Sequence, residues 1–185
     1  MPFIRPPAVA TAGVILPDPL VVLSPHSPAG SMCGMAPSAP ASATYPTANL
    51  AIFYPVRVTR SFTAAQLFVL NGATASGNID VGIYDSSGTR LVSSGSTAQS
   101  GTSAVQAFNI ADTLLAAGWY YLAVAMDNTT GTLLRSTVNH FTAAASVGVG
   151  QQSSAFPLPA TATIVRAASG THFICVGATS RVGFV

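Results

Sequence analysis

One alternating run of apolar and polar residues limits how this chain can fold more than any other feature. Ile79, Val81 and Ile83 alternate with polar or small residues, and this period of two is typical of a β-strand with one face on a core. The residues that follow, Asp85–Gly88, have the composition of a tight turn, because Asp bonds nearby backbone and Gly accepts a positive φ. Residues 78–95 are therefore predicted to form a β-hairpin.

A second run, Trp119–Asp127, combines aromatic, β-branched and small apolar residues and predicts a central strand. Asp112 is expected to cap one helical turn at residues 112–115. Lys and Glu, two strong helix formers, are absent from the chain, which argues against a helical protein. About eight to ten short strands separated by turns predict an all-β fold, an antiparallel β-sandwich. The other strands are expected at residues 50–54, 56–60, 62–70, 104–110, 132–136, 162–166 and 171–176.

Charge is sparse in this chain, because only 6% of the residues are charged and the formal net charge is +2. Such a balance provides no basic surface for nucleic acid, whose recognition depends on clustered Lys and Arg. A nearly neutral surface favours association between copies. The apolar stretch Ala8–Leu16 is too short to cross a bilayer, and prolines interrupt every candidate signal-peptide core. We therefore expect a protein made in the cytoplasm that binds neither nucleic acid nor membrane.

Residues 1–48 differ from the rest of the chain. They hold ten of its thirteen prolines, and proline lacks the N–H and the free φ that a regular helix or a central strand needs. Unlike polar disordered tails, this stretch is apolar, so we expect an extended arm that lies along neighbouring subunits, ahead of a β-sandwich domain at residues 49–185. An arm wrapped on its own domain is the alternative. The expected assembly residues of the arm are Phe3, Ile4, Val14, Ile15, Leu16, Leu20, Val21, Val22 and Leu23.

No constellation of residues predicts catalysis. The histidines are His26, His140 and His172, and no serine lies in a G-x-S-x-G turn. An enzyme would need a cleft that joins His140 or His172 to an aspartate. Cys33 and Cys175 define no metal spacing, and both reduced thiols and a disulfide between them stay open. We therefore expect no enzymatic activity, no cofactor and no metal.

Local structure explains the aspartates of the expected domain. Asp85 and Asp127 lie in predicted turns and Asp112 at its predicted cap, where short acidic side chains bond the backbone. Asp80 is expected at an outward position of its strand. Calcium binding is the alternative, and it requires the loops of Asp85 and Asp127 to lie together.

Three aromatic residues are candidates for sugar binding. Trp119, Tyr121 and Tyr84 offer rings with an apolar face and a polar edge, which suits stacking on a sugar ring. Alternation places Trp119 and Tyr121 on one face of their strand, opposite Tyr120 and Leu122. Aromatic residues in the middle of a sandwich more often belong to the core, so core packing is the competing interpretation.

The pattern Ile79–Val92, followed by Leu114 and Gly118–Val124, resembles jelly-roll modules in virion proteins of tailed bacteriophages. Such modules occur as head decoration proteins, as tail-fibre domains and as carbohydrate-binding domains. The resemblance implies a non-enzymatic virion protein that decorates or cements a capsid or tail, with copies of itself and the major capsid or tail protein as partners. The alternative is an adhesin or tail-fibre module that binds a host surface glycan. The apolar arm favours the first interpretation, because a free-standing carbohydrate-binding module does not usually carry one.

Overall fold

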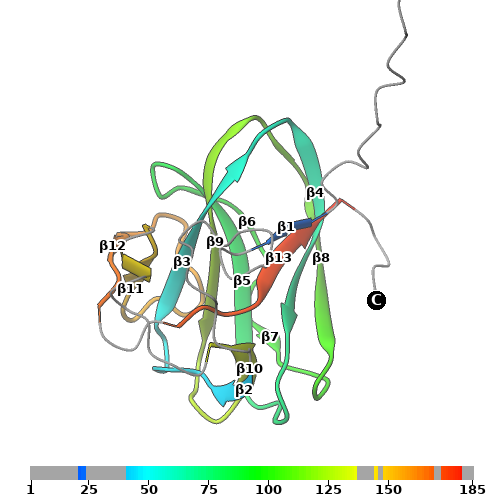
Figure 1. The fold of residues 1–185 in the computed structure, drawn as a ribbon, viewed down its shortest axis with the longest axis vertical. Coiled ribbons are helices and arrows are strands. Elements are labelled where there is room, and N and C mark those ends of the chain that lie inside the picture. Colours follow the sequence, from blue (N-terminus) through cyan, green and yellow to red (C-terminus); the bar gives the residue numbers. More distant parts are fainter. Residues whose placement is uncertain (1–20, 24–40, 137–143, 146–147, 169–171, 181–185) are drawn as a thin grey trace, which may run out of the picture.

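The computed structural model describes residues 21–23, 41–136, 144–145, 148–168 and 172–180. They form an all-β structure of antiparallel sheets, a β-sandwich as the sequence predicts (Figure 1). In chain order the strands are β1 (Val21–Leu23), β2 (Ala41–Thr44), β3 (Ala51–Val58), β4 (Phe62–Leu70), β5 (Asn78–Asp85), β6 (Arg90–Ser93), β7 (Thr97–Ala98), β8 (Val105–Leu115), β9 (Gly118–Met126), β10 (Thr132–Arg135), β11 (Gly150–Gln152), β12 (Val165–Arg166) and β13 (Val176–Thr179).

The large sheet is built around the two runs that dominate the sequence. Its strand order is β12-β11-β3-β9-β5-β6, with β7 beside one end of β5. The aromatic strand β9 lies in the middle, paired with β3 on one side and β5 on the other. The predicted hairpin at residues 78–95 is confirmed, with a β-bulge between Ile83 and Tyr84 where β5 pairs with β6.

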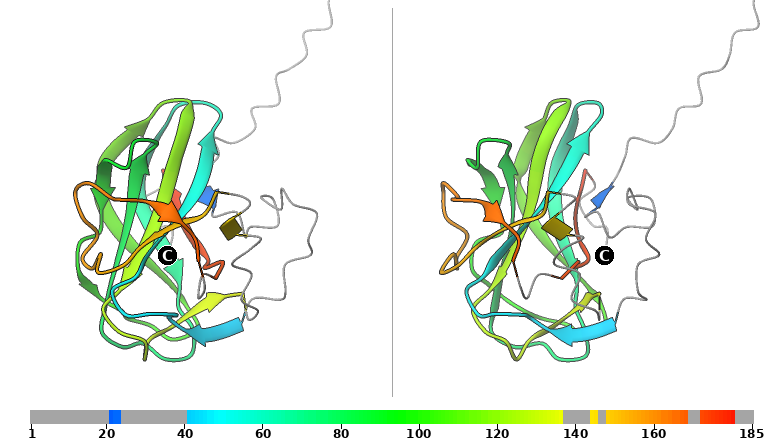
Figure 2. Two further views of the ribbon diagram at one scale, coloured as in Figure 1. Left: turned by 90° about the vertical axis from the view of Figure 1, so that its left-hand side faces the viewer. Right: turned by 60° about the vertical axis from the view of Figure 1, so that its left-hand side comes forward.

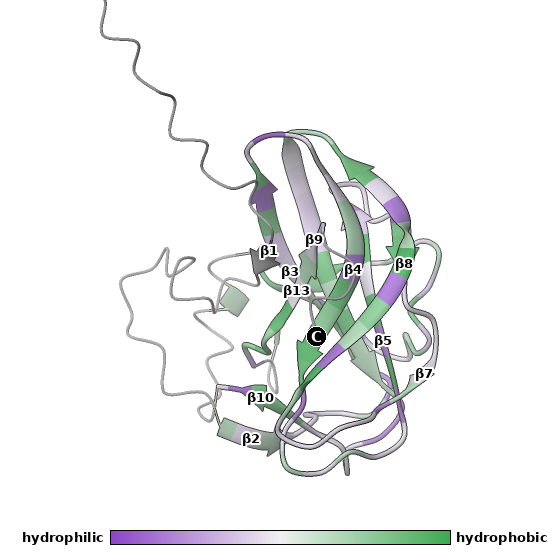
Figure 3. Ribbon diagram, turned by 90° about the vertical axis from the view of Figure 1, so that its right-hand side faces the viewer, coloured by the Kyte–Doolittle hydropathy of each residue, from purple (hydrophilic) through white to green (hydrophobic). Residues whose placement is uncertain are grey.

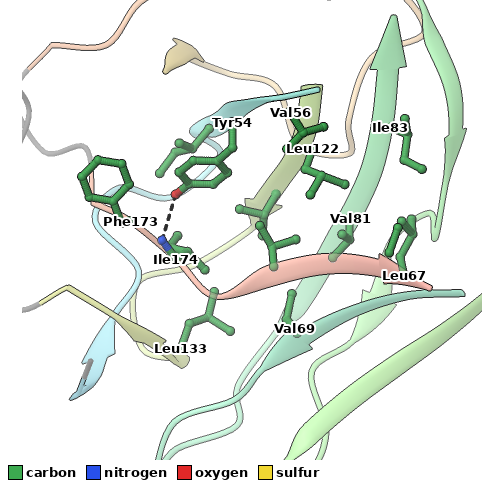
Figure 4. Close-up of a cluster of buried hydrophobic side chains, with 14 of the residues drawn as sticks. Tyr54, Val56, Leu67, Val69, Val81, Ile83, Leu122, Leu133, Phe173 and Ile174 are labelled. Atoms are coloured by element: carbon green, nitrogen blue, oxygen red, sulfur yellow. Dashed lines mark hydrogen bonds between the residues drawn. The ribbon is translucent and has the colours of Figure 1, made fainter. Parts of the chain in front are cut away.

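The small sheet, ordered β1-β13-β4-β8, faces the large one. Alternate residues of both sheets enter a shared core, in which Tyr54, Leu67, Ile83 and Leu122 are almost completely buried (Figure 4). Each such side chain contributes roughly 1.5–3 kcal/mol through the apolar area removed from water. This core explains why strict alternation at β5 was an informative signal.

The amino-terminal boundary of the folded unit lies before residue 49. Strand β2 pairs with β10 in a separate two-stranded sheet. Tyr45 is 1% exposed, and its hydroxyl oxygen lies 2.6 Å from the Leu50 carbonyl and 2.9 Å from the Val124 carbonyl. The predicted division at residues 48 and 49 therefore has to move towards the amino terminus, because residues 41–48 belong to the sandwich.

Several local expectations are wrong for identifiable reasons. Asp112 caps no helical turn, because β8 continues through it to Leu115, with hydrophilic positions interrupting the strand (Figure 3). The strands expected at residues 50–54 and 56–60 are one strand, β3, which runs through Pro55 from Ala51 to Val58. Proline is tolerated where a strand has an open side, and β11 pairs with only residues 51–53 of β3.

Candidate functional site

The outer face of the large sheet, turned away from the core, is covered in part by residues 153–162. We call this segment the strap, and it lies along the outer side of the sheet (Figure 2). Its buried residues Ala155, Leu158 and Ala162 pack with Phe53 and Tyr84 in a second apolar cluster. The large sheet is therefore buried on both faces over part of its area.

The Asp80 side chain, on strand β5 of the large sheet, binds the strap. It points away from the core, as alternation predicts, but it is completely buried and not solvent-facing. Its Oδ2 accepts a hydrogen bond from the Leu158 N–H at 3.0 Å, and its Oδ1 accepts one from Ser94 Oγ at 3.3 Å. Burial raises the pKa of this carboxyl, and the two hydrogen bonds with the charge of Arg90 only partly oppose the rise.

Two more side chains bind the same part of the strap. The Tyr84 hydroxyl donates to the Pro159 carbonyl at 2.6 Å, and the Arg90 guanidinium donates to the Leu158 carbonyl. Tyr84 is fully buried and its ring meets Phe53 edge to face, with centroids 5.2 Å apart. The prediction that Tyr84 contributes to a sugar platform is wrong, because the strap covers its ring.

Beyond the strap, four outer-face residues form what we call the open row: Arg57 and Trp119, which are exposed, and Pro55 and Tyr121, which are half-buried. Trp119 is 52% exposed and lies directly opposite Arg57 in the β3–β9 register. Directly opposite residues share a face, with Cβ atoms roughly 4.5–5.5 Å apart. Tyr121 is opposite Pro55 and half-buried, with its ring edge to face on Phe53 at 6.5 Å.

Alternation predicts Trp119 and Tyr121 on one face and Tyr120 and Leu122 on the other, and the two apolar clusters confirm this for Tyr121 against Tyr120 and Leu122. The competing core interpretation fails for Trp119 and holds in part for Tyr121. Sequence reasoning missed Arg57, which only the strand register brings beside the indole. The open row thus combines apolar ring faces with a guanidinium that can donate to hydroxyl or carboxylate oxygens.

The turn interpretation of Asp85 and Asp127 agrees with their hydrogen bonds. One carboxylate oxygen of Asp85 accepts from Ser87 and Thr89 backbone N–H groups at 2.9 Å. Asp127 accepts from the Asn78 backbone N–H, also at 2.9 Å. The pKa of the Asp85 carboxyl is lowered mainly by the hydrogen bond from the Ser87 hydroxyl, together with these backbone bonds. Burial raises the pKa of Asp127, but hydrogen bonds from the Asn128 side chain and from Asn78 outweigh it and lower the pKa. Because they lie at opposite ends of β5, roughly 20 Å apart by strand rise, the two carboxylates do not share a calcium ion.

Two of the groups considered for catalysis, His172 and Cys175, lie among the described residues. His172 is buried, with Nδ1 3.1 Å from the Ser136 carbonyl oxygen. Cys175 is a partly buried free thiol whose pKa is raised by burial. His26, His140 and Cys33 lie outside the described residues. Among those described, no group of three or more His, Cys, Asp or Glu side chains is placed to hold a metal ion.

The expected assembly residues divide into two groups. Val21, Val22 and Leu23 form β1 and pair with Thr179, Ala178 and Gly177 of β13 at the edge of the small sheet. This pairing places part of the arm on an edge of its own sandwich, as the alternative of an arm wrapped on its own domain has it. The other six lie outside the described residues: Phe3, Ile4, Val14, Ile15, Leu16 and Leu20.

Comparison of the chain with protein-family models, with curated proteins and with solved structures finds no match. Within the described part of the chain, no helix has the length and apolar character required to span a membrane.

Proposed function

We propose that this protein is a non-enzymatic structural subunit of a bacteriophage virion, which decorates or cements the capsid or tail through its amino-terminal segment and contacts between subunits. The observation that carries the proposal is the pairing of β1 with β13. An apolar segment joined to a sheet edge by backbone hydrogen bonds is a general means of protein assembly. The low charge of the chain also favours association, because nearly neutral surfaces repel one another only weakly.

The proposal is tested by two truncations that differ only in β1. A chain that starts at Val21 keeps the strand, whereas one that starts at Ser24 loses it. We expect the full chain and the Val21 chain to form the same oligomer, and the Ser24 chain to dissociate with at least a tenfold higher dissociation constant, equivalent to about 1.4 kcal/mol. Light scattering over a concentration series measures the mass of all three.

Particle binding is the second part of that test. The full chain should co-sediment with particles purified from cells that produce the protein, and the Ser24 chain should remain largely in the supernatant. Circular dichroism checks that the Ser24 chain keeps its β structure. A monomeric full chain that does not bind particles would contradict the proposal.

Sugar binding by the open row is a second candidate function, favoured by the exposed indole of Trp119 on an open sheet face beside Arg57. An indole presents a flat apolar face to the C–H groups of a sugar ring. Arg57 supplies charged donors for a hydroxyl or a uronic acid carboxylate. Host surface glycans are therefore the ligand class that this surface suits.

Replacing Trp119 with Ala should weaken glycan binding at least tenfold without unfolding the domain, because half of the side chain is already in water. The matched control is Leu114→Ala, which removes a residue that is 70% exposed on β8 of the small sheet, away from the open row. A glycan array that includes uronic acid polymers, followed by calorimetry on any bound glycan, measures the effect. Equal binding by both variants would contradict the sugar-binding function, as would an array without any bound glycan.

A further inference from the structure

The edge of the small sheet at β13 carries none of the features that protect natural sheet edges. Exposed edges are usually blunted by charged residues, by proline or by a bulge, because unpaired N–H and C=O groups recruit other strands. Strand β13 reads Val-Gly-Ala-Thr, and all four residues are buried. An edge of this composition is open to a partner strand, and in this structure that strand is β1.

The open edge of the large sheet shows the contrast. Beyond the last residue paired with β11, strand β3 has Pro55, which offers no N–H, and Arg57, which is exposed and charged. Both are residue types that prevent edge-to-edge pairing. The edge at β3 is therefore protected by its own side chains, whereas the edge at β13 is covered by another strand, β1.

The chain between β1 and β2 is long enough for β1 to reach another molecule. Residues 24–40 separate the two strands, and a stretch of this length spans at most about 60 Å when extended. The sandwich from β2 onwards contains the main core. A three-residue strand at the end of such a connection can be exchanged without rebuilding that core.

We infer that β1 is an exchangeable strand, and that in the assembled protein β1 of one copy adds to β13 of a neighbouring copy. The inference rests on the proposed assembly function and specifies the contact that performs it. The same backbone bonds form within one molecule or between two, so the balance depends on the effective concentration of the neighbouring edge. Dilution favours pairing within a molecule, and crowding on a particle favours exchange.

The strand register provides a direct test by disulfide trapping. Val22 is opposite Ala178, and Val21 is opposite Thr179. The Cα separations of opposite residues in antiparallel strands suit a disulfide. Two variants, Val22→Cys with Ala178→Cys and Val21→Cys with Thr179→Cys, are made in a chain whose Cys33 and Cys175 are replaced by Ala. The single variant Val22→Cys is the control for adventitious cross-linking.

After oxidation of the concentrated, assembled protein, non-reducing electrophoresis should show covalent dimers and higher ladders for at least one double variant. Oxidation at high dilution should shift the same variant to an internally linked monomer of increased mobility. If the oligomer is intact by light scattering but only internal links form, exchange is wrong and the assembly proposal survives. If the chain is monomeric at all concentrations and does not bind particles, both fail.

Discussion

Replacing Tyr54 with Phe should lower the free energy of unfolding by about 2–4 kcal/mol, although it removes a single oxygen atom. The Tyr54 hydroxyl donates to the His172 carbonyl at 2.5 Å and accepts from the Ile174 N–H at 3.1 Å, in the core between the sheets (Figure 4). Without this oxygen a backbone acceptor and a backbone donor lose a partner inside the protein. A buried backbone group that loses a hydrogen bond of this kind costs about 1–3 kcal/mol.

The matched control is Tyr120→Phe, which removes a hydroxyl that donates to the Ala116 carbonyl at 3.1 Å on the protein surface. Water replaces that bond, so the loss should stay below about 1 kcal/mol. Urea denaturation followed by fluorescence of Trp119 measures both variants. Equal losses for the two variants would show that the Tyr54 hydroxyl does not connect β3 to the segment before β13.

Replacing Asp80 with Ala should cost about 2–3 kcal/mol and loosen the strap, whereas Asp80→Asn should be at least as stable as the wild type at pH 7. The Ala variant leaves the buried Leu158 N–H without its acceptor, which carries the usual penalty for an unpaired buried group. Asn keeps an acceptor oxygen at that position and removes a buried charge. Hydrogen exchange at the Leu158 amide should increase in the Ala variant and remain slow in the Asn variant.

The Asp80 carboxyl also predicts the sign of a pH effect. Its pKa is raised in the folded protein by burial, so the folded state takes up this proton before the unfolded state does. As the pH falls from 7 through that raised pKa, the wild type should therefore gain stability relative to Asp80→Asn. Asp85 and Asp127 act in the opposite direction. Because their pKa values are lowered in the folded protein, they stabilise the fold at pH values above the ordinary pKa of aspartate, and this contribution is lost as the pH falls into the acid range.

Urea denaturation of the wild type and Asp80→Asn at pH 7 and pH 4.5 separates these effects, because Asp85 and Asp127 are present in both proteins. A stability difference that is the same at both pH values would show that Asp80 does not titrate differently in the folded state. A less stable Asn variant at pH 7 would contradict the assigned cost of the buried charge.

Strands β5 and β9 of the large sheet were predictable because residue alternation agrees there with the packing of one face on a core, whereas β7 and β11 lie where no strand was predicted. Ile79, Val81 and Ile83 alternate and enter the core, and the aromatic run of β9 lies beside them as expected. Asp80 shows where this reasoning stops. Alternation gives its direction correctly, but only the strap determines that the outward side is dry, and the strap comes from a part of the chain without periodicity.

Pairings between distant parts of the chain could not be predicted either, because the pattern within one segment does not show which other segment lies beside it. Arg57 becomes a candidate only through its register with Trp119, and β2 belongs to the sandwich only through its pairing with β10. A proline-rich composition describes residues 1–48 as a whole and hides the two short strands within them. The local sequence predicts that a segment forms a strand better than it predicts which other strand pairs with it.

The pairing of β1 with β13 has a consequence for the order of events during synthesis. Strand β1 ends at Leu23 and β13 begins at Val176, so the ribosome makes β1 well before β13. At roughly 5–20 residues per second, the interval between the two strands is roughly 8–30 s. Strand β1 therefore waits for its partner while β2 to β12 are made, and β3 and β9 have time to pair before β1 does.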